Sequence, residues 1–506
     1  MDADRFFRRV LWLLAVFYAL RLLAGAFLPV FDPSEGRYAS IAAHMAATGD
    51  FLTPHLWHEG VYQSFDGKTP FFFWLAAGSI RVFGQNDFAV RLPSFLAALG
   101  MLAVCFLVLR RFRSREETAL GLLFCGTGAM FYVFSGIVLT DMVLALCISG
   151  AILCFSAFLA LEPTASKREK MVWGLAVFAF LGVGFITKGP VAIVLFGIGP
   201  FLYLCFCRQW KKLSGFPWLT GFLLFFLIAA PWFILKWMDD PEAVKYFFYN
   251  ENFKRFVSKE YGDKYGAGRE MHFGASIWML FFVTVPWCLI PLSALFRKES
   301  RKRFFTPDSF RDPLEGTLLF AFLGMTAFWA LTSRVLLYYM LPVIPCASLW
   351  IACRTASSGE REGSFRRIVL SLGALCCILS LTGLLAAGIL KGFGGDASAY
   401  GIMRLADRLR REGNLPDEVP FCFLREDPYS ADFYNPGILL RHHPKLSAAD
   451  TFLQNQDAIL LTKRKYLSKL PEDASYQEAG YTGKWVILIP DRLLRGAEPS
   501  DLSSKP

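Results

Sequence analysis

The sequence has few charged residues for its length. Of its 506 residues 19% are charged, 55% are hydrophobic and 16% are aromatic, and the mean hydropathy is +0.40. A soluble protein of this size carries roughly 25% charged residues. The shortage is local, because short charged segments separate long apolar runs, and runs of about 18 residues or more can cross a bilayer. The composition therefore predicts a polytopic α-helical membrane protein.

Several functional motifs are also missing. There is no P-loop and no GxGxxG after a predicted strand, so nucleotide-driven chemistry has no support in the sequence. The twelve cysteines include no CxxC pair and no metal-ligand spacing, and eleven lie in or beside apolar runs. Cysteine behaves there as a small hydrophobe. Cys422 is alone in the polar tail, so we expect no disulfide framework.

The net charge of +11 does not indicate a nucleic-acid partner. The basic residues cluster in short loops between apolar runs, which is typical of the cytoplasmic loops of membrane proteins. The first apolar run, 10–30, lacks a small-residue cleavage site and contains Arg21, so we expect an anchor and not a cleaved signal.

We predict eleven membrane spans, and twelve or thirteen if shorter stretches also cross. Their limits are 10–30, 92–109, 118–139, 142–161, 171–187, 190–207, 217–237, 272–296, 314–332, 335–353 and 368–391. Basic clusters precede the first span and follow the second, fourth, sixth, eighth and tenth: Arg5, Arg8 and Arg9; Arg110, Arg111, Arg113 and Arg115; Lys167, Arg168 and Lys170; Arg208, Lys211 and Lys212; Arg297, Lys298, Arg301, Lys302 and Arg303; Arg354, Arg361, Arg366 and Arg367. This alternation predicts a cytoplasmic N-terminus and an outside C-terminus.

Two segments do not fit the pattern of spans. The apolar stretch 70–84 is short for a span and would break the alternation, so we interpret it as an interfacial or re-entrant helix. Residues 392–506 combine the helix-like RLADRLRR with strand-like VPFCFL, AILL and WVILIP. We therefore predict a membrane domain over 1–391, with a long first outside loop at 31–91, and a small soluble α/β domain over 392–506.

Acids and bases meet on the predicted outside face. Asp32, Asp141, Lys188 and Arg334 all stand at span ends on that side. Ionisable residues at membrane depth are costly and usually face a cavity or a partner. Each also has a structural interpretation: Asp32 or Asp141 could cap a helix, and Lys188 could extend to the interface. The aromatic Tyr339 could belong to an interfacial belt.

This arrangement suits a lipid phosphate. Lysine and arginine recognise phosphate, and arginine can bind it through two hydrogen bonds. A carboxylate nearby can orient or deprotonate an attacking hydroxyl, while the cations stabilise the charge that develops on a phosphate leaving group.

Six motifs are spread over residues 28–345. In chain order they are DPSEGRYA (32–39), TGDFLTP (48–54), KTP (68–70), TKGP (187–190), YFFYNENFKRF (246–256) and YMLP (339–342). They resemble D-E-x-R-Y-A, S/T-G-D-W-x-x-P, E-K-P-P, L-T-K-G-P, Y-F-F-x-x-E-H-x-x-R-F and Y-x-L-P of the bacterial aminoarabinose–lipid A transferase and protein O-mannosyltransferase families, which share the GT-C fold.

The resemblance implies a GT-C fold and transfer of a sugar from a polyprenyl (undecaprenyl) phosphate to an envelope acceptor at the periplasmic face of the bacterial inner membrane. It implies Asp32 as the catalytic acid/base residue and phosphate or lipid contacts at Lys68, Arg255 and Tyr339. The other predicted substrate-binding residues are Glu35, Arg37, Asp141, Lys188 and Glu251. Lipid A or another glycan is the first acceptor class, and a protein hydroxyl is the second.

Two departures from the family motifs concern a metal. The glutamate before the lysine of E-K-P is Gly67 here, with Asp66 one residue earlier, and the histidine after the glutamate of E-H is Asn252. In relatives these side chains can help to bind a divalent metal, so we do not predict a metal site or a required cofactor here, and a divalent metal is kept as an alternative.

Two other classes of protein are alternatives. A flippase or transporter of lipid-linked sugars would predict inverted repeats and polar residues near mid-membrane, whereas Arg21 is the clearest charge within a span. A non-catalytic assembly protein would depend on its tail domain, and the acids and bases of the first loop speak against it.

Overall fold

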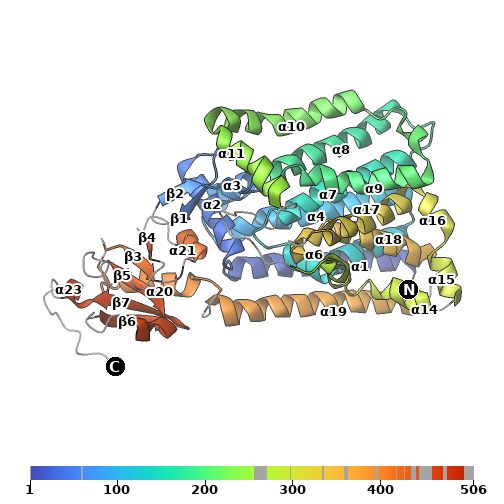
Figure 1. The fold of residues 1–506 in the computed structure, drawn as a ribbon. Coiled ribbons are helices and arrows are strands. Elements are labelled where there is room, and N and C mark those ends of the chain that lie inside the picture. Colours follow the sequence, from blue (N-terminus) through green and yellow to red (C-terminus); the bar gives the residue numbers. More distant parts are fainter. Residues whose placement is uncertain are drawn as a thin grey trace.

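The protein is a bundle of long helices with a small sheet-containing domain at one end (Figure 1). The computed structural model describes residues 2–58, 61–255, 271–296, 298–332, 335–357, 363–393, 397–416, 419–424, 426, 428–434, 440–443, 458–470 and 476–494. Arg297, Arg334 and Arg361, which belong to the predicted charge pattern, lie outside these residues.

Each of the eleven predicted spans corresponds to a helix or to a pair of helices. They are α1 (Ala3–Phe27), α4 (Asp87–Phe112), α5 (Arg115–Thr127) with α6 (Ala129–Phe134), α7 (Asp141–Ala160), α8 (Lys167–Lys188), α9 (Val191–Cys207), α10 (Trp218–Asp239), α13 (Ala275–Thr284) with α14 (Leu289–Phe296), α17 (Pro313–Ala330), α18 (Val343–Ser357) and α19 (Gly363–Ala387). In the described part of the chain, seven helices are long and apolar enough to cross a membrane, or eight if the bent pair α13–α14 is one span.

Three predicted spans differ from continuous helices. The span predicted at 118–139 is interrupted at Gly128, where the backbone leaves the helical region between α5 and α6. The span at 272–296 bends by 104° between α13 and α14. The span at 335–353 begins late, because the 3-10 turn η3 (Leu337–Met340) and Pro342 precede α18.

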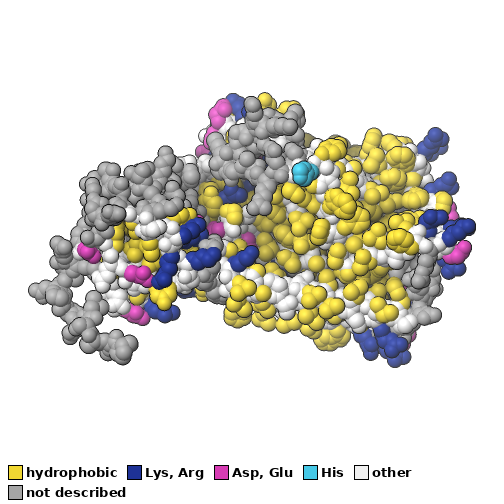
Figure 2. Space-filling model, turned by 60° about the horizontal axis from the view of Figure 1, so that its bottom comes forward, with side chains coloured by type: hydrophobic (Ala, Val, Ile, Leu, Met, Phe, Trp, Pro, Cys, Tyr) yellow, Lys and Arg dark blue, Asp and Glu magenta, His cyan; other side chains and the backbone are white. Residues whose placement is uncertain are grey.

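Ion pairs join the loops that the charge pattern predicts to share one face. Asp4 in the first turn of α1 pairs with Arg115 at 2.6 Å, Arg111 in the last turn of α4 pairs with Glu169 at 3.0 Å, and Arg366 in α19 pairs with Glu116 at 2.8 Å. This face lies at the end of the bundle opposite the sheet domain. In Figure 2, hydrophobic side chains cover the flank of the bundle and basic ones gather at its end, as expected for a membrane protein.

The shorter connecting elements lie mainly near the ends of the bundle. They are the 3-10 turn η1 (Trp210–Leu213), α11 (Pro241–Tyr246), the π-helix η2 (Phe247–Lys254), α15 (Lys298–Phe304), α16 (Pro307–Arg311) and the π-helix η4 (Gly388–Phe393). Between α1 and α4 the chain forms α2 (Ser34–Thr48), a hairpin of β1 (His55–His58) and β2 (Val61–Ser64), and α3 (Phe71–Phe83). The stretch 70–84 is thus a 13-residue apolar helix.

The tail contains the predicted mixture of helix and strands. Its five-stranded sheet has the order β4-β3-β5-β7-β6. The elements are α20 (Tyr400–Arg411), β3 (Phe421–Leu424), α21 (Tyr429–Tyr434), β4 (Leu440–His443), β5 (Ile459–Lys463), η6 (Arg464–Lys469), β6 (Tyr476–Thr482), β7 (Trp485–Pro490) and α23 (Asp491–Leu494). Every residue of β3, β5 and β7 is buried, including Thr462 and Lys463 at the end of β5. Figure 1 shows α21 between this sheet and the helical bundle.

Candidate functional site

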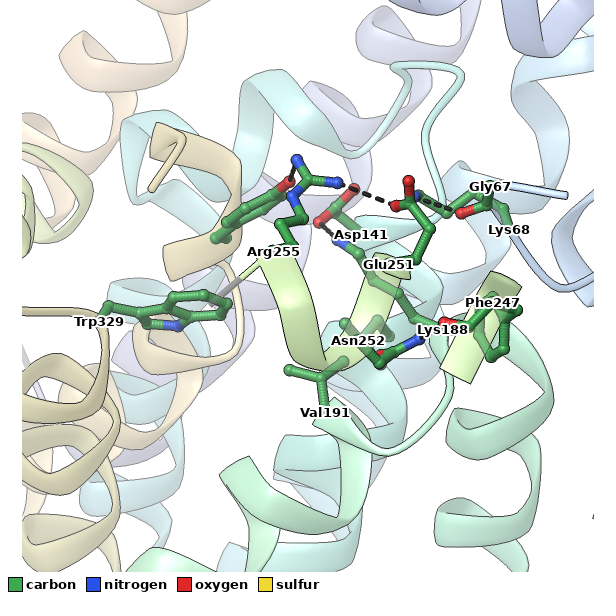
Figure 3. A pocket seen from close by; sticks show the side chains of 12 residues that line it. Gly67, Lys68, Asp141, Lys188, Val191, Phe247, Glu251, Asn252, Arg255 and Trp329 are labelled. Atoms are coloured by element: carbon green, nitrogen blue, oxygen red, sulfur yellow. Dashed lines mark hydrogen bonds and ion pairs between the residues drawn. The ribbon is translucent and has the colours of Figure 1, made fainter. Parts of the chain in front are cut away.

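A pocket lined by charged and apolar side chains opens at the end of the bundle that faces the C-terminal domain. It contains about 590 Å³ of space, including its open mouth. Figure 3 shows the charged side chains that point into it from separate elements. The lining residues are Gly67, Lys68, Asp141, Leu144, Lys188, Val191, Phe247, Glu251, Asn252, Arg255, Trp329 and Tyr339. Six of the nine predicted site residues are among them.

One acid of the pocket, Asp141, is paired with a lysine. Asp141 is the first residue of α7 and Lys188 is the last residue of α8, and Lys188 Nζ lies 2.6 Å from the Asp141 carboxylate. The α8 helix ends there because Gly189 adopts φ +76°, which few other residues tolerate. Lys188 Nζ also lies 4.3 Å from the centre of the Tyr339 ring, within the range of a cation–π contact.

A second acid holds the other two cations. Glu251 Oε2 accepts hydrogen bonds from Lys68 Nζ at 3.2 Å and from Arg255 Nη1 at 3.1 Å. Glu251 lies in η2, and Arg255 directly follows this helix, four residues further along the chain. Arg255 Nη2 donates a hydrogen bond to the Tyr339 hydroxyl at 3.0 Å. Tyr339 therefore contacts one cation of each group, so the two halves of the pocket are joined.

The pocket carries an excess of positive charge. Three cations, Lys68, Lys188 and Arg255, face two carboxylates, and the side chains of Asp141 and Glu251 are each only 4% exposed. Burial strengthens electrostatic interactions because solvent screening falls. Next to the pocket, burial raises the pKa of Tyr38 in α2 to about 12, so that phenol is neutral at physiological pH. An additional anion would balance the remaining charge.

The three other predicted site residues have different neighbours. The Asp32 carboxylate accepts hydrogen bonds from the backbone N–H of Ser430, at 2.9 Å, and from its hydroxyl. Capping of α2 by Asp32 is wrong, because the helix begins with Pro33 as its N-cap residue and without a side-chain cap. Counted from Arg37, the acid of D-E-x-R-Y-A falls on Ser34 in this sequence. The sequence predicted Asp32 as the catalytic residue, and Asp32 is not among the residues that line the pocket.

Glu35 and Arg37 also face other groups. Glu35 is 4% exposed, pairs with Arg91 at 3.2 Å and accepts the backbone N–H of Val138 at 2.9 Å. The Arg37 guanidinium lies between 5.7 and 5.8 Å from the rings of Tyr38, Phe65 and Tyr429. These contacts join α2 to its surroundings.

The sequence interpretation did not include Trp329 among the site residues. Its ring lies 5.1 Å from that of Tyr339 and forms one wall of the pocket. A tryptophan near the end of a predicted span is typical of the interfacial aromatic belt, so its residue type gives no signal of a role in a site.

Both positions at which this sequence departs from the metal-related family motifs, Gly67 and Asn252, line the pocket. Gly67 has no side chain, Asn252 Nδ2 donates to the Phe247 carbonyl at 2.9 Å, and Glu251 is shared by two cations. Within the described residues, potential ligands gather instead as Glu117, Glu315 and Cys353. That group lies beside arginines, with Arg113 3.9 Å and Arg354 3.1 Å from Glu315.

Comparison with known proteins gives both a fold and a group of relatives. Residues 67–235 match the family model of dolichyl-phosphate-mannose-protein mannosyltransferases. An undecaprenyl phosphate-α-4-amino-4-deoxy-L-arabinose arabinosyl transferase of Aeromonas salmonicida is 28% identical over 362 residues, which are 70% of this chain and 62% of that protein. A transferase of the same name, numbered 1, from Sodalis glossinidius is 29% identical over 385 residues, which are 73% of this chain and 64% of that protein. The chain thus aligns with somewhat less than two thirds of the length of these curated relatives.

Two solved structures show the fold. The crystal structure of ArnT from Cupriavidus metallidurans bound to undecaprenyl phosphate superposes with a TM-score of 0.72 at 19% identity, covering 95% of this chain and 97% of that chain. This chain is a GT-C fold protein that resembles the aminoarabinose and mannosyl transferases. The archaeal oligosaccharyltransferase AglB of Archaeoglobus fulgidus, with an inhibitory peptide and a dolichol-phosphate, gives a TM-score of 0.52 at 13% identity, over 90% of this chain and 69% of that one. The fold prediction is confirmed, including the small sheet at the C-terminus of the GT-C protein.

Proposed function

We propose that this GT-C protein is a glycosyltransferase that moves a sugar from an undecaprenyl phosphate carrier to lipid A or a related envelope acceptor. The observation that carries this proposal is the pocket in which Lys68, Lys188 and Arg255 meet two buried carboxylates. The names of the curated relatives, arabinosyl transferases that use undecaprenyl phosphate-linked aminoarabinose, support the donor class.

The proposed reaction is an inverting displacement. An acceptor oxygen forms a bond to the anomeric carbon of the sugar while the bond from that carbon to the phosphate oxygen breaks, and the electron pair leaves with the phosphate. The phosphate changes from a singly charged diester to a monoester with up to two negative charges. Preorganised cations stabilise such developing charge, and this is the role we assign to Lys68, Lys188 and Arg255.

In this proposal the Asp141 carboxylate is the general base that takes the proton of the acceptor. Asp141 lines the pocket beside Lys188, one of the cations assigned to the phosphate. A hydroxyl acceptor would lose its proton to the carboxylate. A phosphate acceptor would need no deprotonation, and the carboxylate would then orient it. Glu251 holds Lys68 and Arg255 in place, which lowers the cost of arranging them around the phosphate.

An apolar groove is suited to the lipid chain of the donor. It contains about 1160 Å³ of space, including its open side, and is lined by α3, α4, α7 and α8, with Phe71, Val143 and Val183 near the pocket end. The same elements carry the pocket: α3 follows Lys68 closely, α7 begins with Asp141, and α8 ends with Lys188. A polyprenyl chain in this groove would therefore place its phosphate among the three cations.

We propose that the pocket faces the periplasm, with the N-terminus in the cytoplasm and residues 392–506 outside the inner membrane. The clustered basic residues at the opposite face support this orientation. Reporter fusions after Arg113, Lys170, Lys212 and Arg303 should report the cytoplasm, and a fusion after Pro506 should report the periplasm. A cytoplasmic report from the last fusion would overturn the proposed orientation.

The function is tested with the purified full-length protein, a defined set of undecaprenyl phosphate-linked sugars and lipid A as acceptor. Mass spectrometry should detect the glycosylated acceptor together with free undecaprenyl phosphate. Lys68→Ala should abolish most of the product, whereas Lys245→Ala, an exposed lysine beside Glu242, should transfer at the normal rate. Absence of product with every donor and acceptor would contradict the proposal.

A protein O-mannosyltransferase is the second candidate. It is favoured by the family model that matches residues 67–235. The same assay distinguishes the two if it includes mannosyl phosphate lipids and a serine- and threonine-rich polypeptide. Mannosylated polypeptide without glycosylated lipid A would replace the first proposal by the second.

A further inference from the structure

We infer that Tyr434, in the C-terminal domain, is a positioning residue for Asp141, the carboxylate of the pocket to which we assign the acceptor proton. It acts through a continuous set of hydrogen bonds and ion pairs that ends at the segment preceding Asp141. The inference deepens the proposed transferase function and rests on it for its kinetic test.

The set begins where α21 meets the helical bundle. The Tyr434 hydroxyl donates to Asp87 Oδ1 at 2.6 Å and accepts the backbone N–H of Val30 at 2.6 Å. Val30 N–H also lies 3.0 Å from Asp87 Oδ1. One phenol oxygen of the C-terminal domain therefore joins the exit of α1 to the first residue of α4.

The set continues through a buried arginine. Arg91 Nη1 lies 3.4 Å from Asp87, and Arg91 Nη2 lies 3.2 Å from Glu35 in α2. The guanidinium also donates to the carbonyl of Pro29 at 2.9 Å, and the side chains of Arg91 and Glu35 are each 5% exposed. Because this arginine is enclosed, a shift of Asp87 is transmitted to Glu35 and is not absorbed by solvent.

Glu35 then holds the segment that leads into the pocket. Its second oxygen accepts the backbone N–H of Val138 at 2.9 Å. The neighbouring carbonyl of Leu139 accepts the Ser94 hydroxyl of α4 at 3.4 Å. Three residues after Val138, Asp141 begins α7 and pairs with Lys188 at 2.6 Å. The backbone that fixes the direction of the Asp141 side chain is thus tied to α2 and α4.

The contacts of this set join segments that are far apart in the sequence, so they exist only in the folded tertiary structure. Tyr434 and Asp87 are 347 residues apart, and Val138 and Glu35 are 103 residues apart. The C-terminal domain would therefore contribute to catalysis without touching substrate, by stabilising one position of the 135–140 segment. Misplacement of a catalytic group by about 1 Å can reduce a rate by roughly 100-fold.

The test compares Tyr434→Phe with Tyr466→Phe in the full-length protein. Both variants remove a phenol hydroxyl that donates to a carboxylate, but Tyr466 donates to Glu426 at 3.2 Å within the C-terminal domain. We expect Tyr434→Phe to lower kcat about tenfold, because the loss of one hydroxyl should displace Asp141 by only part of the distance of about 1 Å that costs roughly 100-fold in rate. The KM for the lipid donor should stay unchanged. Tyr466→Phe should keep both constants.

A second readout needs no substrate. Amide hydrogen exchange of peptides that cover 135–141 should be faster in Tyr434→Phe than in Tyr466→Phe or the unaltered protein. Equal exchange in all three proteins would overturn the positioning role. If the exchange differs but the unaltered protein transfers no sugar, the positioning role holds and the proposed function fails.

A double-substitution cycle separates a shared path from two local effects. If Tyr434 acts through Glu35, Tyr434→Phe should add little to the kcat loss already caused by Glu35→Gln. The inference would be overturned if the kcat losses of Tyr434→Phe and Glu35→Gln multiplied in the double variant. It would also be overturned if Tyr434→Phe and Tyr466→Phe had equal kcat values. If Tyr434→Phe does not fold, Asp87→Asn provides the same comparison at the next contact.

Discussion

The Asp32 carboxylate accepts a 2.9 Å hydrogen bond from the backbone N–H of Ser430, 398 residues further along the chain. Ser430 lies in the first turn of α21, so an acid from the first loop satisfies a backbone donor of the C-terminal domain. Asp432 of the same helix accepts a hydrogen bond from Tyr62 at 2.8 Å. The first loop and the C-terminal domain therefore form one interface beside the pocket.

The roles of Asp32 and Asp141 are separated by two matched substitutions. Asp141→Asn removes the charge and basicity of the acid that lines the pocket, and loss of a general base typically lowers a rate by about 10²–10⁴-fold. Asp32→Asn keeps an oxygen that can accept from Ser430, so we expect near-normal transfer and thermal stability. Transfer rate and stability are measured on the same preparations. A stable Asp32→Asn protein that loses turnover would restore Asp32 to the catalytic role.

The phosphate site is tested by removing its cations one at a time. Lys68→Ala and Arg255→Ala should each weaken binding of the undecaprenyl phosphate donor, because losing a hydrogen bond to a charged group costs about 1.5–3 kcal/mol. This corresponds to roughly 10- to 150-fold in Kd. Lys245→Ala is the control, with a side chain that is 56% exposed. Unchanged affinity in both pocket variants would place the phosphate elsewhere.

The close approach of α2 and α21 depends on Gly36. A Cβ atom at this position would lie 2.7 Å from the Ser430 backbone nitrogen and would also clash with the Asp32 carboxylate. Gly36→Ala should therefore destabilise the protein by about 1–3 kcal/mol, the usual cost of overpacking. Gly78→Ala in α3 is the matched control, because a Cβ there meets nothing within 4 Å. Thermal unfolding that is equal in the two variants would show that α21 can move away without cost.

The stability of the first loop should depend on pH through His44. Burial, and then the nearby His55, lower the pKa of His44 below its ordinary 6.5, while Asp432 and Asp50 oppose this shift. The unfolded chain thus binds a proton more readily than the folded protein, so stability is lost as pH falls from above 6.5 towards the lowered pKa.

The melting temperature is the measurement that checks this dependence. Between pH values of about 7.5 and about 5.5, His44→Gln should lose less thermal stability than the unaltered protein. His272→Gln, which changes an exposed histidine, should retain the full decrease. A decrease in His44→Gln as steep as in the unaltered protein would assign the pH dependence to other groups.

The apolar runs determined most of the helical architecture. A run of hydrophobic residues long enough to cross a bilayer satisfies its backbone hydrogen bonds locally by forming a helix. The sequence alone could therefore place all eleven predicted spans on helices or helix pairs, and it predicted α20 and the buried strands of the tail. It did not predict the 104° bend between α13 and α14, which lies within one continuous apolar run.

Motifs determined which residues gather in the pocket, but only the tertiary structure decided their partners. Lys188 was predicted because ionisable residues at span ends are costly and usually face a cavity or a partner. Lys68 and Arg255 were predicted because they fall on motifs of the families that the sequence resembles. Which acid lies beside which cation depends on the packing of α7, α8 and η2. The same holds for Asp32. Its local sequence suggested a helix cap or a catalytic residue, whereas in the folded protein it accepts hydrogen bonds from Ser430. The partners of these side chains lie on distant segments, which only packing brings within hydrogen-bond distance.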